Sequence, residues 1–191
     1  MKIIGIVLAG GKSSRMGTDK GLLPIGKETF ASHIGNKLEQ SGCSQVIIST
    51  NNEAYKSLGY PLIQDRHQEI GPLGGLHACM LAYPAEGYMV VSCDSPYISV
   101  SALQKMKALF IQKHHSIIGI NEEREHPLIA CYAGSVLSVI EKQIEIENYR
   151  MKDLIKKVMV DYLSIPSEET FNCNTPSDLK LSVDAQTMLG S

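Results

Sequence analysis

The residues best suited to chemistry lie near the N-terminus, where glycines and positive charges share one short segment. Residues 8–20 read LAGGKSSRMGTDK, with cations at Lys12, Arg15 and Lys20 and no acid before Asp19. Glycines let the backbone approach a phosphate and turn its N–H groups inward, and the cations neutralise phosphate charge. The segment therefore predicts a triphosphate site, the alternative being a tight surface turn whose charges are only solvated.

This segment differs from two common nucleotide-binding motifs. A Walker A motif needs a glycine five positions before Gly11, where the chain has Ile6. The dinucleotide fingerprint G-x-G-x-x-G is also absent from the segment.

Two aspartates, Asp65 and Asp94, each follow an apolar stretch. Asp94 precedes Ser95-Pro96, and a proline there prevents an ordinary interior strand from continuing. Mg²⁺ typically takes one or two carboxylates and completes its shell with phosphate oxygens and water. We therefore predict Asp94 as a Mg²⁺ ligand, the alternative being a turn-capping aspartate. For Asp65 the alternative is a salt bridge with Arg66 or a solvated turn.

Strand-like and helix-like stretches alternate along the chain. We expect strands at residues 2–8, 46–49, 61–64, 88–93, 116–120 and 160–165, and a polar turn at 122–125 before an apolar run at 127–132. We expect helices at residues 29–42, 73–82, 103–110, 136–140 and 151–158, and a last helix from Thr175. The alternation predicts an α/β three-layer sandwich with a mostly parallel sheet, as one domain over residues 1–191 with a tail that frays after about 181.

In such a sheet, ligands bind beyond the carboxyl ends of the strands. That edge should gather the loop after Leu8, Asp65, Asp94 and the segment around Asn174.

Composition excludes some classes of function. The net charge of -2 offers no basic surplus for nucleic acid, and no apolar run approaches the roughly 20 residues that span a membrane. The apolar N-terminus reads as a first strand and not as a signal peptide. The five cysteines are widely spaced, as expected for reduced thiols in a cytoplasmic protein. The six histidines lack metal-ligand spacing.

Residues 8–20 resemble the signature L-A-[AG]-G-x-x-x-R-M-[GA] of sugar-nucleotide-type nucleotidyltransferases. Gly10-Gly11 followed by TDKG at 18–21 is more specific and resembles the molybdenum cofactor guanylyltransferases. Further segments agree in order: QD at 64–65, GPLGG at 71–75, CDSPYI at 93–98, HPL at 126–128 and NCNTP at 172–176. The resemblance covers nearly the whole chain and implies a Rossmann-like nucleotidyltransferase fold.

The resemblance implies transfer of GMP from GTP to the terminal phosphate of molybdopterin, with release of pyrophosphate. Mg²⁺ on Asp94 would bridge the phosphates, Lys20 would neutralise the α-phosphate, and Arg15 would hold the leaving pyrophosphate. Asp65 would contact the nucleoside. The implied GTP-binding residues are Leu8, Ala9, Gly10, Gly11, Lys20, Asp65 and Asp94. Other molybdenum cofactor biosynthesis proteins and acceptor molybdoenzymes are the expected protein partners.

The second substrate is expected at Asn172 and Asn174. If Phe171 is a buried strand residue, strand alternation places both amides on one side, where they suit a pterin edge or its phosphate. The alternative is that Asn174 only caps the helix that begins at Thr175.

One segment departs from the resemblance. Residues 143–153 begin acidic and have Arg150 as their one arginine, where the resemblance leads us to expect a more basic segment.

Two other functions remain possible from the sequence. A cytidylyltransferase or sugar-phosphate nucleotidyltransferase would share the fold, but these enzymes usually have Ala-Gly in place of Gly10-Gly11. The second function is a nucleotide-binding module that has lost catalysis, but the presence of Arg15, Lys20 and Asp94 argues against it.

Overall fold

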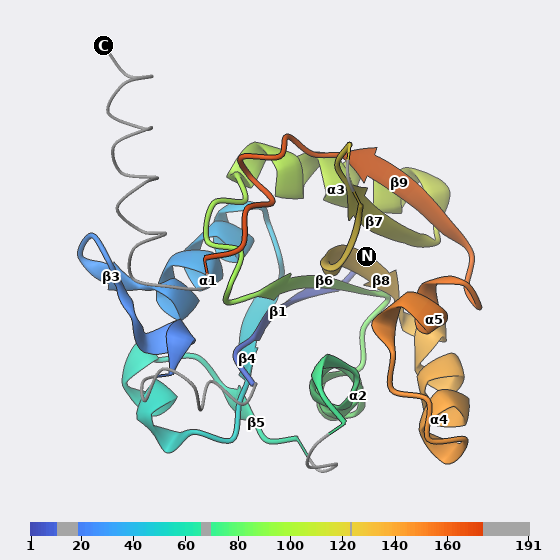
Figure 1. The fold of residues 1–191 in the computed structure, drawn as a ribbon, viewed down its shortest axis with the longest axis horizontal. Coiled ribbons are helices and arrows are strands. Elements are labelled where there is room, and N and C mark those ends of the chain that lie inside the picture. The colour runs from blue at the N-terminus through green and yellow to red at the C-terminus, as the bar shows by residue number, and fades with distance from the viewer. Residues whose placement is uncertain (11–18, 66–69, 123, 174–191) are drawn as a thin grey trace.

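A seven-stranded sheet forms the centre of the computed structural model, which describes residues 1–10, 19–65, 70–122 and 124–173 (Figure 1). Its strand order is β5-β4-β1-β6-β8-β7-β9. The strands are β1 (Ile3–Leu8), β4 (Gln45–Ser49), β5 (Leu62–Ile63), β6 (Gly87–Ser92), β7 (Ser116–Ile120), β8 (Glu125–Ala133) and β9 (Val160–Ser164). Only β8 runs against its neighbours β6 and β7 among these strands, so the mostly parallel α/β sheet is confirmed.

Helices cover both faces of the sheet (Figure 1). On one face α1 (Phe30–Gln40) packs beside α3 (Val100–Lys113), and on the other α2 (Pro72–Ala82) packs beside α4 (Leu137–Glu145), which contacts α5 (Met151–Ile155). Helix α1 begins with a capping box, in which Thr29 and Ser32 each accept the other's backbone N–H. Helix α2 begins at Gly71-Pro72, with proline at its first position, where no N–H is needed.

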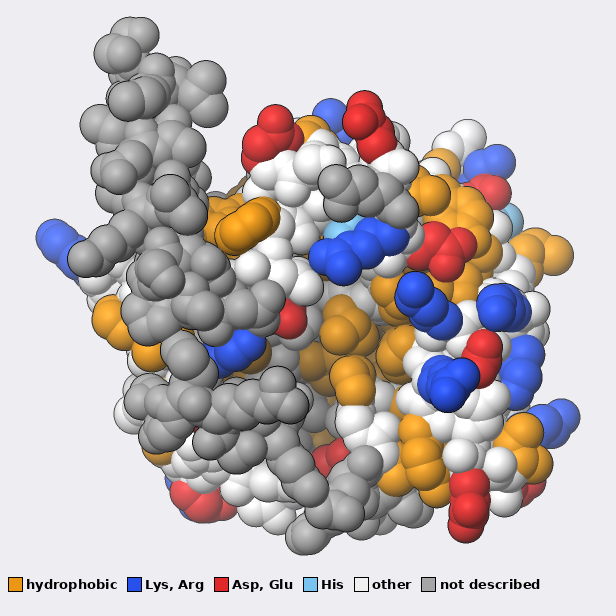
Figure 2. Space-filling view, in the orientation of Figure 1, with side chains coloured by type: hydrophobic (Ala, Val, Ile, Leu, Met, Phe, Trp, Pro, Cys, Tyr) orange, Lys and Arg blue, Asp and Glu red, His pale blue; other side chains and the backbone are white. Residues whose placement is uncertain are grey.

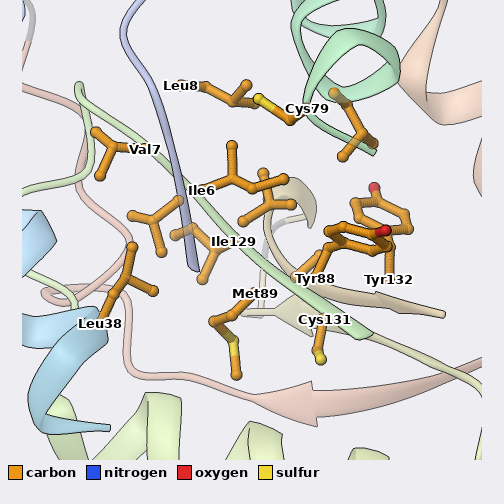
Figure 3. Close-up of a cluster of buried hydrophobic side chains, with 14 of the residues drawn as sticks. Ile6, Val7, Leu8, Leu38, Cys79, Tyr88, Met89, Ile129, Cys131 and Tyr132 are labelled. Atoms are coloured by element: carbon orange, nitrogen blue, oxygen red, sulfur yellow. The ribbon is translucent and has the colours of Figure 1, made fainter. Parts of the chain in front are cut away.

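The core surrounds β1, whose six residues are all buried because helices cover it from both sides. Figure 3 shows Leu38 of α1 on one side of this strand and Cys79 of α2 on the other. Tyr88 and Met89 of β6 and Tyr132 of β8 extend the same cluster. A shift of one residue would exchange its side chains between the two helix layers and disrupt the close packing on both faces.

The structure adds elements that periodicity did not predict. Residues 125–133 form one long antiparallel strand, so the expected polar turn ends before Glu125. A hairpin of β2 (Pro24–Ile25) and β3 (Glu28–Thr29) and the 3-10 turns η1 (Lys20–Leu22), η2 (Glu53–Leu58) and η3 (Gly134–Val136) were too short to predict. The helix expected from Thr175 lies outside the described residues.

All five cysteines lie in the described part of the chain, and none is in a disulfide. No helix in the described ranges is long and apolar enough to cross a membrane.

The start of β6 depends on close contact between a glycine and a ring of α3. A β-carbon at Gly87 would lie 2.5 and 2.7 Å from two ring atoms of Phe110, which is 2% exposed. We expect Gly87→Ala to lower the free energy of unfolding by about 1–3 kcal/mol through overpacking. Urea unfolding measures this loss. The same change made together with Phe110→Leu should cost less than it does alone, and an equal cost in both backgrounds would contradict the contact.

Candidate nucleotide-binding site

Strand register brings the predicted site residues to one edge of the sheet. Leu8 pairs with Ser49 of β4 and with Ser92 of β6, and Ser49 pairs with Ile63 of β5. The ladder continues one residue further, because the N–H of Ala9 donates to the Ser49 carbonyl at 2.9 Å and that of Cys93 to the Leu8 carbonyl at 3.0 Å. The loops that follow therefore leave the sheet side by side.

Five predicted site residues lie at this edge of the structure: Leu8, Ala9, Gly10, Asp65 and Asp94. Leu8 and Ala9 are buried, whereas Gly10 is exposed. Gly11, Arg15 and Asn174 lie outside the described residues, so their positions stay predictions.

Lys20 begins the turn η1, directly after the part of the loop that is not described. The turn is closed by the N–H of Leu22 donating to Asp19 and that of Leu23 donating to Lys20, both at 3.0 Å. The carbonyl of Leu23 in turn accepts the N–H of Phe30, the first residue of α1. The backbone that carries Lys20 is thus tied to a core helix.

Asp94 lies in the turn after β6 and contacts the last described segment of the chain. The Ser95 hydroxyl lies 3.3 Å from an Asp94 carboxylate oxygen and 3.4 Å from the Asn172 amide oxygen. The N–H of Cys173 donates to the Asp94 carbonyl at 2.8 Å. Asn172 therefore lies beside Asp94, although 77 positions separate Ser95 and Asn172 in sequence.

The expectation about Phe171 was wrong. Residues 171–173 form no strand, and the Phe171 side chain is 47% exposed. Its ring instead lies beside Tyr97, with centroids 6.4 Å apart. Backbone pairing of Cys173 with Asp94 fixes this segment instead. Strand alternation consequently gives no argument for where the side chain of Asn174 points.

A lysine supports the turn that carries Asp94. The ammonium of Lys37, from α1, donates to the Pro96 carbonyl at 2.8 Å. Burial lowers the pKa of Lys37, and Glu169 and Glu28 act in the opposite direction. Glu169 also accepts the Ser99 N–H at 2.8 Å, so the turn and the start of α3 are joined to the chain after β9.

The charged groups of the site converge near one buried thiol. Burial raises the pKa of Cys93 to about 12, with further increases from the charges of Asp94 and Asp19 and a decrease from Lys20. Asp94 and Lys20 come from different loops, and both lie close enough to influence this thiol.

Asp65 lies against the first turn of α2. A β-carbon at Gly74 would lie 2.5 and 2.7 Å from the two carboxylate oxygens of Asp65, so only glycine leaves them room. The partial positive charge of a helix N-terminus favours a carboxylate in this place. The N–H of Asp65 donates to the Asn51 side chain at 2.9 Å, which fixes the backbone. Arg66, the alternative partner for Asp65, lies outside the described residues.

The oxygen donors at this edge are of the kind that Mg²⁺ prefers. Asp94 contributes a carboxylate, and the Asn172 amide oxygen shares a hydroxyl neighbour with it. Within the described ranges, no three His, Cys, Asp or Glu side chains form a group that could hold a metal. With nucleotides, Mg²⁺ usually takes one or two carboxylates and completes its shell with phosphate oxygens and water.

A buried glutamine begins the segment that departs from the resemblance. Gln143 is fully buried, and its amide donates to the carbonyls of Asn148 at 2.9 Å and Arg150 at 3.2 Å. These bonds shape the turn between α4 and α5. Arg150 itself is exposed.

A mostly parallel sheet with glycines after its first strand and carboxylates after β5 and β6 is typical of a nucleotide-binding α/β protein. Comparison with known sequences makes the class specific, because the family described as "MobA-like NTP transferase domain" matches residues 5–162. The chain belongs to this family and is a nucleotidyltransferase.

Individual relatives agree with this assignment. A "Probable molybdenum cofactor guanylyltransferase" of Flavobacterium johnsoniae is 34% identical over 180 residues, covering 91% of this chain and 92% of the relative. The crystal structure of "Molybdopterin-guanine dinucleotide biosynthesis protein A" from Archaeoglobus fulgidus superposes with a TM-score of 0.77 at 21% identity, covering 97% and 99% of the two chains. A 2-C-methyl-D-erythritol 4-phosphate cytidylyltransferase from Thermus thermophilus reaches 0.72 at 11% identity, covering 95% and 98%. Both structures confirm the α/β fold.

The contact between Gly74 and Asp65 gives a prediction about nucleotide binding. Gly→Ala inside a helix normally stabilises it by about 1 kcal/mol. Here the new β-carbon would displace the Asp65 carboxylate and crowd Ile70, which lies 2.7 Å from the same point. We expect Gly74→Ala to weaken binding of a nucleoside triphosphate several-fold, as measured by calorimetry.

The control for Gly74→Ala uses a variant without the carboxylate. In an Asp65→Ala background the substitution should leave affinity unchanged, although the crowding of Ile70 persists. A further loss of affinity in that background would assign the effect to Ile70 and remove Asp65 from the site.

Proposed function

We propose that this nucleotidyltransferase transfers GMP from GTP to the terminal phosphate of molybdopterin and releases pyrophosphate. The observation that carries the proposal is the strand register that pairs Leu8 with Ser92, so that Gly10 and Asp94 leave the sheet at the same edge. The name of the Flavobacterium relative, similar along 91% of the chain, supports the guanylyl and molybdenum cofactor parts.

The reaction needs positioning and charge neutralisation more than it needs a protein nucleophile. The terminal phosphate of the pterin attacks the α-phosphorus of GTP, and the bond to the pyrophosphate oxygen breaks. Lys20 neutralises charge that builds on the α-phosphate, and Arg15 with the N–H groups of Gly10 and Gly11 holds the leaving pyrophosphate. Preorganised cations of this kind stabilise the transition state more than the ground state.

Asp94 is the proposed Mg²⁺ ligand, with Asn172 as its oxygen neighbour. When bound, the cation would supply charge neutralisation at the phosphate oxygens. The Ser95 hydroxyl lies within hydrogen-bonding distance of both side chains, and Lys37 donates to the Pro96 carbonyl of the same turn. Asn172 and Asn174 are proposed to bind molybdopterin, which places the attacking phosphate next to Asp94.

Asp65 is proposed to contact the nucleoside. Guanine presents N1–H and N2–H donors, and a carboxylate or backbone carbonyl can accept both. A cytidylyltransferase with the same fold shows that the fold alone leaves the base undetermined. We further propose that the enzyme acts in the cytoplasm with other molybdenum cofactor biosynthesis proteins and acceptor molybdoenzymes.

A nucleotide panel tests the choice of base. We expect GTP with Mg²⁺ to raise the melting temperature more than ATP, CTP or UTP do, because a base without guanine's donors leaves buried acceptors unpaired at roughly 1–3 kcal/mol each. A ligand at 100 times its dissociation constant stabilises by about 2.7 kcal/mol, which sets the scale of the shift. Equal shifts with all four nucleotides would remove guanine from the proposal, and a larger shift with CTP would favour the cytidylyl alternative.

Loss of the metal anchor tests catalysis. We expect Asp94→Asn to keep its melting temperature, because the side chain is only partly buried, and to lose at least about 100-fold in pyrophosphate release with GTP and molybdopterin. Multiple turnovers by the wild-type protein would also separate an enzyme from a binding module. Near-normal release by Asp94→Asn at saturating Mg²⁺ would exclude Asp94 as the ligand.

A further inference from the structure

A cluster of polar side chains holds the residue before Lys20. The Asp19 carboxylate accepts three hydrogen bonds, from the Gly21 N–H at 3.2 Å, the Asn52 amide at 3.1 Å and the Tyr55 hydroxyl. Asp19 thereby caps η1, the turn whose first residue is Lys20. We call Asp19, Asn52 and Tyr55 the Asp19 clamp.

The clamp is fixed to the sheet through the segment after β4. Asn52 uses its amide oxygen to cap η2, accepting the Ala54 N–H at 3.0 Å, and its own N–H donates to the Thr50 hydroxyl at 3.2 Å. The N–H of Thr50 donates to Ile63 at 3.0 Å, so the chain of bonds ends in the β4–β5 pairing. A rigid element therefore supports the turn that carries Lys20.

Tyr55 is an unusual residue to serve only as a turn cap. Its side chain is fully buried, and a β-carbon at Gly21 would collide with its hydroxyl, so the turn packs directly on the phenol. Burial first, and then the bond to Asp19, raise the pKa of Tyr55 far above its ordinary value. The phenol therefore stays protonated and donates to Asp19 at any working pH.

We propose that the Asp19 clamp positions Lys20 for the transfer step, with Tyr55 and Asn52 acting through Asp19. A cation that stabilises a transition state must be held within about 0.5 Å of its productive place by supporting side chains. Lys20 follows the glycine loop, and the clamp connects it to β4, one of the two strands that flank β1. This role rests on the proposed function, because it assumes that Lys20 acts on the nucleotide.

A double-mutant cycle between Tyr55→Phe and Lys20→Ala separates positioning from stability. We expect Tyr55→Phe alone to slow single-turnover pyrophosphate release by about 10-fold, with a smaller change in the GTP dissociation constant. Misplacing a catalytic group lowers the rate of the chemical step more than it lowers substrate affinity. In the Lys20→Ala background the same change should have less than about a two-fold effect, because there is no ammonium left to misplace. If the double variant is slowed by the product of the two single-variant factors, the proposal is overturned.

Tyr60→Phe is the matched control. The Tyr60 hydroxyl donates to the Asn36 side chain at 3.0 Å, in a part-buried bond away from the clamp. We expect this variant to keep the wild-type single-turnover rate. If it slows turnover as much as Tyr55→Phe does, the effect is a general loss of stability and the proposal fails.

An exchange of partners provides a second test that does not depend on Tyr55. Asp19→Asn should slow turnover, since its new amide faces the amide of Asn52. Adding Asn52→Asp restores a donor and an acceptor across the 3.1 Å contact, and we expect it to recover most of the rate. A double variant that melts like the wild type but stays as slow as Asp19→Asn would contradict positioning by hydrogen bonds.

The experiment also distinguishes failure of the clamp from failure of the proposed function. If the wild-type protein releases no pyrophosphate from GTP and molybdopterin, the proposed reaction is wrong. The cycle is then measured on the dissociation constant of whichever nucleoside triphosphate stabilises the wild type most. Coupling between positions 20 and 55 would still support the clamp, and additivity would overturn it.

Discussion

The parallel pairing of β1 with β4 on one side and β6 on the other is the constraint on which the site depends. Leu8 lies opposite both Ser49 and Ser92, so three loops begin at the same level of the sheet. A shift of one residue would turn the side chains of a fully buried strand toward the wrong faces. The hydrophobic core therefore fixes the level at which the segments after Leu8 and Ser92 leave the sheet.

The antiparallel strand β8 also determines which segments meet at this edge of the sheet. Because β8 opposes both β6 and β7, these two strands run in the same direction, and β9 follows β7 in parallel. The chain after β9 therefore leaves the sheet on the side where β6 ends. This return places Asn172 and Cys173 beside Asp94 and Ser95, so that a first and a second substrate could meet at one turn.

Sequence reasoning predicted the elements in which many residues repeat one hydrophobic period, and it missed the features that depend on a single tertiary contact. The long apolar strands and amphipathic helices were predicted, as was the edge that gathers Gly10, Asp65 and Asp94, because that edge follows from topology. Strand β8 was recognised only as an apolar run, since its first residues, Glu125 and His126, are polar. The Asp19 clamp, the Lys37 bond to Pro96 and the glycine contact of Asp65 join segments far apart in sequence, and such contacts leave no local pattern.

The two ends of a bound nucleotide place different demands on this fold. The phosphate end needs backbone N–H groups, cations and a carboxylate at the strand ends, and a cytidylyltransferase with 11% identity can keep the same architecture. The base end needs a few acceptors or donors in the loops, where one unpaired polar group discriminates strongly between substrates. In this chain the position of Asp65 is set by Gly74 at the start of α2, a helix that packs on β1 and β4. The residue proposed to read the nucleoside is therefore supported by β1 and β4, and β1 also carries the segment proposed to bind the phosphates, so the proposed base and phosphate contacts would share one scaffold.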